Sequence, residues 1–372
     1  MDLAVPRHLK WSAGACDGLR HGVVTSTRDG SLVPVSLILP IRNEADAIDD
    51  CLDGIVAQSY PAELVEVIVV DGMSTDRTRD RVLSRAGSDG RIRLIDNPER
   101  ITPSGLNAGI RAARHDVIVR MDGHSIPPSD YVEQCVRVLQ ESDAWAVGGT
   151  MARTGLTPTQ RAIARATSMP LGVGDSMHNY ATSGTWVETV YLGTWRRDVF
   201  ERIGLFDPEL VRDQDDELSY RIRASGGRIW FDPRISCEYR PRPSLRALFR
   251  QYREYACFKV RVFQKHPAAA RWRHLVPPIW VALVVLLPIA AIAWPVALLA
   301  WIAMMFLYVA VLGAGVLRVD PQGAPRWRIF AALVTLHAGY GIGFWQGFVR
   351  FFPRWFRDRA GTVPRLPRRG EA

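Results

Sequence analysis

The stretch V-I-V-V-D-G-M-S-T-D-R-T at residues 67–78 decides the fold of this chain. It begins as a run of β-branched residues and stops at Asp71, and such a continuous apolar run is typical of a buried parallel strand. A second run, V-I-V-R-M-D-G-H at 117–124, stops at Asp122, and a third, V-S-L-I-L-P-I-R-N-E, covers 35–44. Open α/β sheets hold ligands beyond the carboxyl ends of their strands. The pattern therefore predicts that Asp71 and Asp122 share one edge of a sheet.

Segments with helical spacing separate these strands. The apolar residues of 47–55 fall on one helical face, and further helices are expected from Arg77 onwards and around 105–113. Asp76 is a candidate cap for the second of these helices. Another strand is expected at 92–95. This alternation predicts an α/β domain over 33–240, with a doubly wound, mostly parallel sheet and helices on both faces.

The composition changes abruptly after residue 274. Residues 275–317 contain no charged side chain, and one membrane span needs about 20 apolar residues. Two spans are predicted, about 275–294 and 295–317, with a break near Trp294–Pro295. The alternative is a buried helical hairpin in a soluble core. A third segment, 329–349, is less apolar and glycine-rich, so it either spans the membrane or is re-entrant. Together these segments form a predicted transmembrane region, 275–350.

Positive charge gathers on both sides of the apolar region. The chain has a formal net charge of +9, with ten Lys/Arg and one acid in 240–274 and ten Arg and three acids in 318–372. This distribution favours anionic membrane lipids at the cytoplasmic face as partners. Nucleic acid is not an expected partner, because the remaining, folded part is mildly acidic.

The N-terminal extension, 1–32, has no apolar stretch of the kind that marks a signal peptide. The five cysteines are odd in number and show no paired spacing, which indicates free thiols in a reducing compartment. We therefore predict a multi-pass protein of the inner or plasma membrane whose N-terminal domain is cytoplasmic.

Residues 241–274 contain a basic amphipathic segment. Its apolar residues form one stripe, and its arginines lie off that stripe, so the segment is predicted to lie in the plane of the lipid headgroups. The alternative is a helix packed on the domain. The tail, 351–372, is Arg-rich, and three spans would place it outside, against the positive-inside tendency. We therefore expect the third apolar segment to be re-entrant or to lie on the surface.

Four blocks of sequence are similar to those of a known family: P-I-R-N-E (40–44), V-D-G-M-S-T-D-R-T (70–78), R-M-D-G-H (120–124) and Q-D-D-E-L-S-Y-R (214–221). In this order and spacing they resemble the family 2 inverting glycosyltransferases with the GT-A fold. The likeness is strongest to the membrane-attached branch that builds succinoglycan-type exopolysaccharides, and it covers about 33–260. It implies transfer of a sugar from a nucleotide diphosphate sugar, with UDP favoured, to a polyprenyl-diphosphate-linked saccharide.

The resemblance also implies which residues bind the nucleotide sugar. Asp71 can accept the N–H of a uracil ring, and the turn 40–44 can offer backbone groups and the Glu44 carboxylate to the nucleoside. The alternatives are a turn or cap role for Asp71 and a helix first-turn role for Glu44. The segment 250–253 resembles a region that covers the donor diphosphate, although the two residues that follow it depart from that pattern. The predicted donor-binding set is Pro40, Arg42, Asn43, Glu44, Asp71, Asp122, Gln251 and Arg253.

The block 122–124 takes the place of the family's D-x-D motif. The resemblance implies that Mn²⁺ or Mg²⁺ is bound here and neutralises the charge of the leaving diphosphate. Asp122 and His124 are the predicted ligands, and the imidazole favours Mn²⁺. The alternatives are that only Asp122 binds the metal, or that His124 hydrogen-bonds a neighbour.

The acidic cluster at 213–217 contains the predicted general base. An inverting transfer needs one base to take the proton of the acceptor hydroxyl. Asp215 matches the family's aspartate and is the predicted base, with Asp216 in reserve. The alternative is an acidic first turn of a helix.

Other functions fit less well. A polyprenyl-phosphate glycosyltransferase and a processive polysaccharide synthase are close alternatives, although a synthase would need more spans. A catalytically inactive membrane scaffold is disfavoured by the presence of Asp71, Asp122 and Asp215 together. A nucleotidyltransferase would show a Gly-rich basic loop after its first strand, and P-I-R-N-E is not such a loop.

Overall fold

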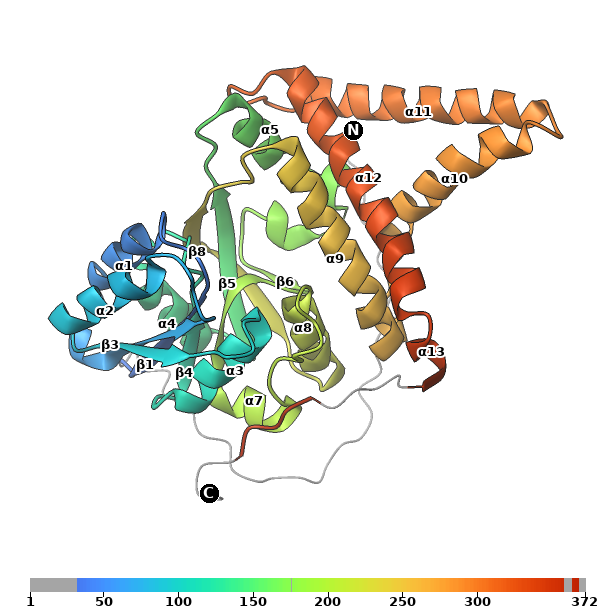
Figure 1. Cartoon of the computed structure of the whole chain (residues 1–372). Coiled ribbons are helices and arrows are strands. Elements are labelled where there is room, and N and C mark those ends of the chain that lie inside the picture. The colour runs from blue at the N-terminus through green and yellow to red at the C-terminus, as the bar shows by residue number, and fades with distance from the viewer. Residues whose placement is uncertain (1–31, 175, 358–362, 368–372) are drawn as a thin grey trace.

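The computed structural model describes residues 32–174, 176–357 and 363–367. It consists of an α/β domain followed by a helical region from which a long hairpin projects (Figure 1). Apart from residue 32, the N-terminal extension lies outside the described residues, and so do residues 358–362 and 368–372 of the Arg-rich tail.

One mixed sheet of eight strands forms the centre of the domain, in the order β3-β2-β1-β4-β7-β5-β8-β6. Strands β1, β2, β3 and β4 pair in parallel with one another, and β5 pairs in parallel with β8, whereas β7 is antiparallel to β4 and β5, and β6 is antiparallel to β8. This confirms the predicted α/β class. The strands are β1 (Val35–Ile41), β2 (Val65–Asp71), β3 (Ile92–Asp96), β4 (Val117–Arg120), β5 (Ala146–Arg153), β6 (Thr185–Val187), β7 (Tyr191–Arg196) and β8 (Ile229–Tyr239).

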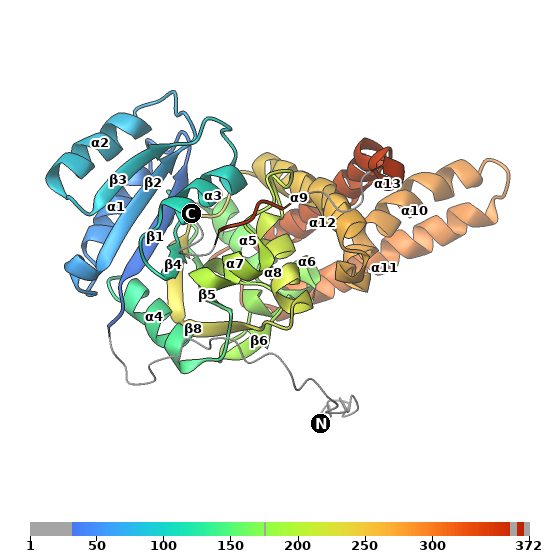
Figure 2. The ribbon, with the colours of Figure 1, turned by 90° about the horizontal axis from the view of Figure 1, so that it is seen from below.

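Helices cover both faces of the sheet (Figure 2). Alternate residues of a strand point to opposite faces, so Leu37 joins a core with α1, α2 and α4, whereas Ile38 joins a core with α3, α7 and α8. The helices of the domain are α1 (Ile48–Val56), α2 (Thr78–Ser88), α3 (Thr102–Ala112), α4 (Tyr131–Glu141), α5 (Pro158–Ala166), α6 (Pro170–Val173), α7 (Arg197–Ile203) and α8 (Gln214–Ala224).

The register of the parallel strands places the predicted acidic residues at one edge. Asp71 ends β2 opposite Ile41 of β1, and Arg120 ends β4 opposite Ile38. Asp122 follows two residues later. The carboxyl ends of β1, β2 and β4 therefore meet at the edge that the sequence indicated.

The C-terminal region contains α9 (Leu245–Lys265), α10 (Val276–Ala290), α11 (Val296–Arg318), α12 (Arg326–Phe351) and α13 (Arg354–Arg357). Two helices of the described part are long and apolar enough to cross a membrane, Trp272–Ala290 and Val296–Arg318. They form the hairpin, and most of their surface is exposed (Figure 1). Pro295 caps α11, so the break falls where it was predicted.

The third apolar segment differs from its expectation. α12 is one continuous helix of 26 residues and lacks the interruption that a re-entrant segment would have. It packs along α9 and against α5, and its Leu333 is fully buried in a core shared with Leu248 of α9. Because it is largely covered by protein, α12 belongs to the body of the molecule.

The amphipathic helix α9 begins at Ser244, whose side chain accepts a hydrogen bond from Ala247 N at 3.2 Å. In its second half, Lys259 and Arg261 are buried and paired with acids of the domain. These two residues cannot meet lipid headgroups, so this half follows the alternative of a helix packed on the domain. Arg246 and Arg250 in the first half are exposed.

Candidate active site

A cavity of about 1740 Å³ runs through the molecule between the sheet edge and the C-terminal helices. One end is lined by residues that follow β1, β2 and β4, and the acids of α8 line the middle. The other end is lined by residues of α10, α11 and α12, among them Trp280, Tyr308 and Leu336. The cavity thus connects the acidic sheet edge to the base of the hairpin.

The turn 40–44 is held against the turn that follows β2. Asn43 adopts a left-handed conformation with φ 54°, which asparagine tolerates better than most residues. Its backbone N–H donates to Ser74 Oγ at 2.9 Å, and its Oδ1 accepts from Thr75 N at 2.8 Å. Pro40, Arg42 and Glu44 line the cavity, whereas Asn43 does not and instead positions them.

Asp71 does not line the cavity, and its contact with the donor stays a prediction. The residue is fully buried, and its carboxylate accepts from Ser74 N and from Arg79 Nη1, each at 3.1 Å. The structure therefore gives it the turn role named above as the alternative. Gly72 lines the cavity beside it. Asp76 Oδ1 accepts from Thr78 N at 3.0 Å, but Arg77 is the N-cap of α2 and its side chain makes no cap hydrogen bond, so the prediction of Asp76 as the cap was wrong.

Arg120 links the two acidic segments. Its Nε donates to Asp122 Oδ1 at 3.0 Å, and its Nη1 donates to Asp215 of α8. The Arg120 side chain is 8% exposed, and the three residues line the cavity together. Burial opposes the charge of Arg120, but the two carboxylates outweigh it and raise the pKa of the guanidinium. The last residue of β4 thus ties the D-x-H segment to the predicted base.

His124 contacts the turn 40–44. Its Nδ1 lies 3.1 Å from Glu44 Oε1, and both side chains line the cavity. Burial favours the neutral ring, but the hydrogen bond to Glu44 and the nearby Asp122 outweigh it and raise the pKa of His124. The alternative role of His124, a hydrogen bond to a neighbouring side chain, is thus present. This bond uses Nδ1, so Nε2 is the ring nitrogen that could bind a metal.

The acids of α8 fall into two environments. Burial, Asp122 and Asp216 raise the pKa of Asp215, against the opposing charge of Arg120. Asp216 and Asp213 both pair with the buried Lys259, Asp213 at 3.1 Å. Burial opposes the charge of Asp216, but Lys259 outweighs it and lowers the pKa of this carboxyl. Asp215 is therefore the stronger base, and the geometry favours it over Asp216.

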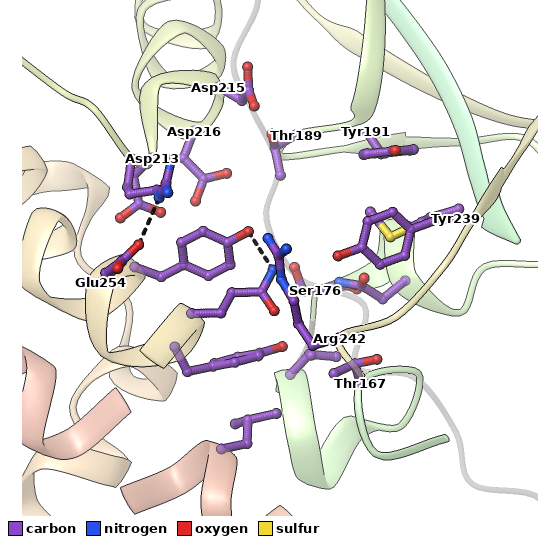
Figure 3. A pocket seen from close by; sticks show the side chains of 18 of the residues that line it. Thr167, Ser176, Thr189, Tyr191, Asp213, Asp215, Asp216, Tyr239, Arg242 and Glu254 are labelled. Carbon is purple, nitrogen blue, oxygen red and sulfur yellow. Dashed lines mark hydrogen bonds and ion pairs between the residues drawn. The ribbon is translucent and has the colours of Figure 1, made fainter. Parts of the chain in front are cut away.

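Figure 3 shows how these side chains surround the cavity. Asp213, Asp216 and Glu254 lie along one wall, and Thr189, Tyr191 and Tyr239 lie across from them. Arg242 extends toward the middle.

The two donor-binding residues predicted on α9 differ in position, because only one of them lines the cavity. Gln251 lines the cavity and donates to Tyr255 Oη at 3.0 Å. Arg253 does not line the cavity, since its backbone lies against Gly343 of α12. The geometry thus does not support the predicted donor contact of Arg253.

Arg153 and Arg242 are among the cavity residues that the sequence reasoning missed. Each lies at or just after the end of a strand, β5 or β8, which is the signal that could have found them. Neither strand was assigned from the sequence.

Comparisons with known proteins agree with this site and fold. Residues 36–204 match the family model described as glycosyl transferase family 2. The succinoglycan biosynthesis protein ExoA of Rhizobium meliloti (strain 1021) is 31% identical over 318 residues, which are 85% of this chain and 95% of that protein. An enzyme of Methanococcus voltae is 27% identical over 62% of this chain and 74% of its own length. It is named dolichyl N-acetyl-α-D-glucosaminyl phosphate 3-β-D-2,3-diacetamido-2,3-dideoxy-β-D-glucuronosyltransferase.

A solved structure shares the fold. The mannosyltransferase PcManGT of Pyrobaculum calidifontis, in complex with GDP-mannose and Mn²⁺, superposes with a TM-score of 0.55 and 22% identity, covering 84% of this chain and 88% of its own. The fold and the acidic segments, together with these likenesses, define a glycosyltransferase. More narrowly, the chain belongs to glycosyltransferase family 2, as the resemblance indicated.

Proposed function

We propose that this glycosyltransferase moves a sugar, with inversion, from a nucleotide diphosphate sugar to a lipid-linked saccharide at the cytoplasmic face of the membrane. The observation that carries the proposal is the link from Asp122 through Arg120 to Asp215, inside a cavity that reaches the hairpin. This link supports the proposal, because the carboxylate proposed to bind the metal and the proposed base then lie at one point of that cavity.

The donor is assigned to the end of the cavity formed by the turn 40–44, Gly72 and Asp122. Within the described residues no cluster of three or more His, Cys, Asp or Glu side chains could hold a metal by itself. Asp122 and His124 nevertheless fit a divalent cation that takes its other ligands from diphosphate oxygens and water. When bound, Mn²⁺ or Mg²⁺ would neutralise the diphosphate charge, and the Mn²⁺ in the related mannosyltransferase supports this choice.

Asp215 is the proposed base. Its carboxylate takes the proton of the acceptor hydroxyl while the hydroxyl oxygen forms the new bond to the anomeric carbon. The bond from that carbon to the diphosphate breaks on the opposite face, which inverts the centre. One carboxylate is sufficient for this step. Arg120 positions Asp215 toward Asp122 and so toward the donor.

The acceptor is assigned to the part of the cavity nearer the hairpin. The cavity wall there includes Trp280, Val311 and Leu312. The Methanococcus voltae relative acts, by its name, on a dolichyl-phosphate-linked sugar, and ExoA takes part in succinoglycan biosynthesis. Both support a lipid-linked saccharide and assembly of an extracellular or envelope polysaccharide.

Two alternatives use the same site. A polyprenyl-phosphate glycosyltransferase would take the lipid phosphate itself as acceptor. A processive synthase would need more spans than the two candidates in the described part of the chain, which makes it the less favoured alternative.

The test is release of nucleoside diphosphate from a panel of UDP-, GDP- and dTDP-sugars, with polyprenyl-diphosphate-linked saccharides as acceptors and Mn²⁺ or Mg²⁺ present. We expect release from one donor, its abolition by EDTA, and a loss of about 10²–10⁴-fold in Asp215→Asn. Asp216→Asn should lose less. Asp53→Asn, which breaks only a surface ion pair with Arg85, is the matched control and should keep full activity. Equal release by wild type and Asp215→Asn would contradict the assigned base.

A further inference from the structure

Two arginines lie at the sheet edge between the acidic site and the hairpin. Arg153 is the last residue of β5, and its register partner in β8 is Tyr239. Arg242 follows Tyr239 by three residues. Both arginines line the cavity, at the carboxyl ends of two neighbouring parallel strands.

These arginines differ in charge balance from three other cations of the cavity. Arg120, Lys259 and Arg273 line the same cavity, and each is paired with a carboxylate. Arg153 instead donates to neutral oxygens, Asn179 Oδ1 at 2.5 Å and Ser168 Oγ at 3.3 Å. Throughout the described ranges, neither Arg153 nor Arg242 forms an ion pair with a carboxylate.

The positive charge of Arg153 is therefore held without a counterion. Burial lowers the pKa of this guanidinium, which reports the loss of solvation. Arginine nevertheless remains charged in proteins, so the guanidinium does not lose its proton and its lost solvation stays uncompensated. An anionic ligand that entered the cavity would restore the balance through charge-assisted hydrogen bonds.

The position of the pair indicates which anion this is. Tyr239, the register partner of Arg153, has its ring centroid 6.1 Å from that of His124 and 6.1 Å from that of Tyr191, so one side chain separates the strand that carries Arg153 from the D-x-H segment. In the other direction, Asn179 accepts a hydrogen bond from Arg153, and its Nδ2 lies 3.1 Å from His178 Nε2; both side chains line the cavity.

Beyond these residues the cavity wall becomes apolar, with Trp280, Val311 and Leu312 from the hairpin. A ligand that fits this sequence of surfaces has a polar group at Asp215, an anionic group next to it and a hydrocarbon chain beyond. A nucleotide sugar has no such chain, whereas a saccharide joined through phosphate to a polyprenyl lipid has all three parts in this order.

We propose that Arg153 and Arg242 bind the phosphate oxygens of the lipid-linked acceptor, and that its hydrocarbon chain lies against Trp280, Val311 and Leu312. The planar guanidinium groups suit bidentate binding of phosphate. This assignment rests on the proposed function and adds to it the residues that recognise the acceptor.

The experiment measures binding to the full-length protein in detergent micelles with EDTA, so that neither turnover nor a metal contributes. Three probes distinguish the contributions of the phosphate groups and of the hydrocarbon chain to binding: farnesyl diphosphate, farnesol and inorganic pyrophosphate. Arg153→Gln and Arg242→Gln are each expected to raise the Kd for farnesyl diphosphate by tenfold or more, as the loss of a charge-assisted bond implies. Arg153→Lys should fall between wild type and Arg153→Gln.

Farnesol binding in EDTA, and the Kd for the nucleoside diphosphate product measured separately with Mn²⁺, should stay unchanged in all variants, which also shows that they are folded. Arg111→Gln is the matched control, because Arg111 is exposed on α3 and does not line the cavity.

Unchanged binding of farnesyl diphosphate in both Gln variants would overturn the assignment. An equal loss of nucleoside diphosphate affinity would move the two arginines to the donor site and overturn it as well. Pyrophosphate binding as tightly as farnesyl diphosphate would identify a site for free phosphate and reject the lipid. A wild-type protein that binds farnesyl diphosphate through Arg153 but transfers no sugar would instead refute the proposed function alone.

Discussion

Arg120 joins two carboxylates that come from different elements, one that follows β4 and one on α8. Without the guanidinium, Asp122 and Asp215 would be two like charges in a partly buried site. Such a pair resists ionisation of both members. The arginine therefore offsets the repulsion between the two carboxylates and holds them together.

Arg120→Lys is expected to lower turnover by about 10²-fold, because an ammonium group cannot make two directed bonds at once. Release of nucleoside diphosphate at saturating donor measures it. Arg111→Lys, on the surface of α3, is the control for the same exchange. Full turnover in Arg120→Lys would show that the bridge has no part in catalysis.

Glu217 makes stability depend on pH. It is fully buried on α8 and accepts from Arg221 Nε at 2.7 Å, and His266 Nε2 lies 2.9 Å away. Burial by itself would raise its pKa, but His266 and Arg221 outweigh burial and hold the pKa below the usual 4.5. Below about pH 4.5 the unfolded chain therefore binds more protons than the folded chain.

The stabilisation by Glu217 is thus complete above this pH and is lost as the pH falls through the lowered pKa. In thermal unfolding followed between pH 7 and 3, Glu217→Gln should be less stable than wild type at pH 7. The difference between the two proteins should shrink in the acid range. If the difference in unfolding temperature between the two proteins were the same at every pH, Glu217 would not contribute to the pH dependence of stability.

At the scale of elements, glycines set the distance between α9 and α12. Gly339, Gly343 and Gly347 recur every four residues and so fall on one face of α12. A Cβ added to Gly343 would lie 2.2 Å from the carbonyl oxygen of Arg253, and one added to Gly347 would lie 2.3 Å from that of Cys257. The glycine content of this segment therefore serves close packing of helix backbones.

Gly343→Ala is expected to force the two helices apart and to destabilise the protein by about 1–3 kcal/mol, as overpacking does. The midpoint of thermal unfolding in detergent measures this change. Gly313→Ala in α11 is the matched control, since nothing lies within 4 Å of a Cβ added there. If the two variants melt at the same temperature, the close approach of α9 and α12 is not a source of stability.

At the scale of the whole molecule, the segment that follows α12 returns to the catalytic domain. Leu205 N donates to Pro364 O at 2.8 Å, and Leu366 is 4% exposed in the core that contains Phe206. A hairpin of two spans has both ends on one side of a membrane. We therefore infer that α10 and α11 cross, that α12 does not, and that residues 363–367 lie on the same side of the membrane as the catalytic domain.

This topology removes the conflict with the positive-inside tendency. Alkaline phosphatase, which is active only outside the cytoplasm, is expected to be active when fused after residue 293 at the tip of the hairpin and inactive when fused after residue 372. A fluorescent protein should report the reverse. Phosphatase activity at the second position would mean that the chain crosses an odd number of times.

Much of the fold follows from local sequence pattern. The apolar runs that end at Asp71 and Asp122 predicted β2 and β4, and the uncharged stretch predicted α10 and α11 with the break at Pro295. These elements are readable because burial on both faces, or in lipid, demands an unbroken apolar run. Strands β5 to β8 carry no such run, since they mix glycine, threonine and charged residues, and they were not assigned.

The sequence by itself determined the α/β class, the family, the edge of the sheet where the acids gather and the apolar hairpin. Only the tertiary structure decided that Asp71 is enclosed by Ser74 and Arg79, that Arg120 joins Asp122 to Asp215, and that Arg153 and Arg242 share a cavity with the hairpin. The physical reason is distance along the chain. A strand or helix is fixed by its own residues, whereas the partner of a charge 95 residues away is fixed only when the sheet and helices pack.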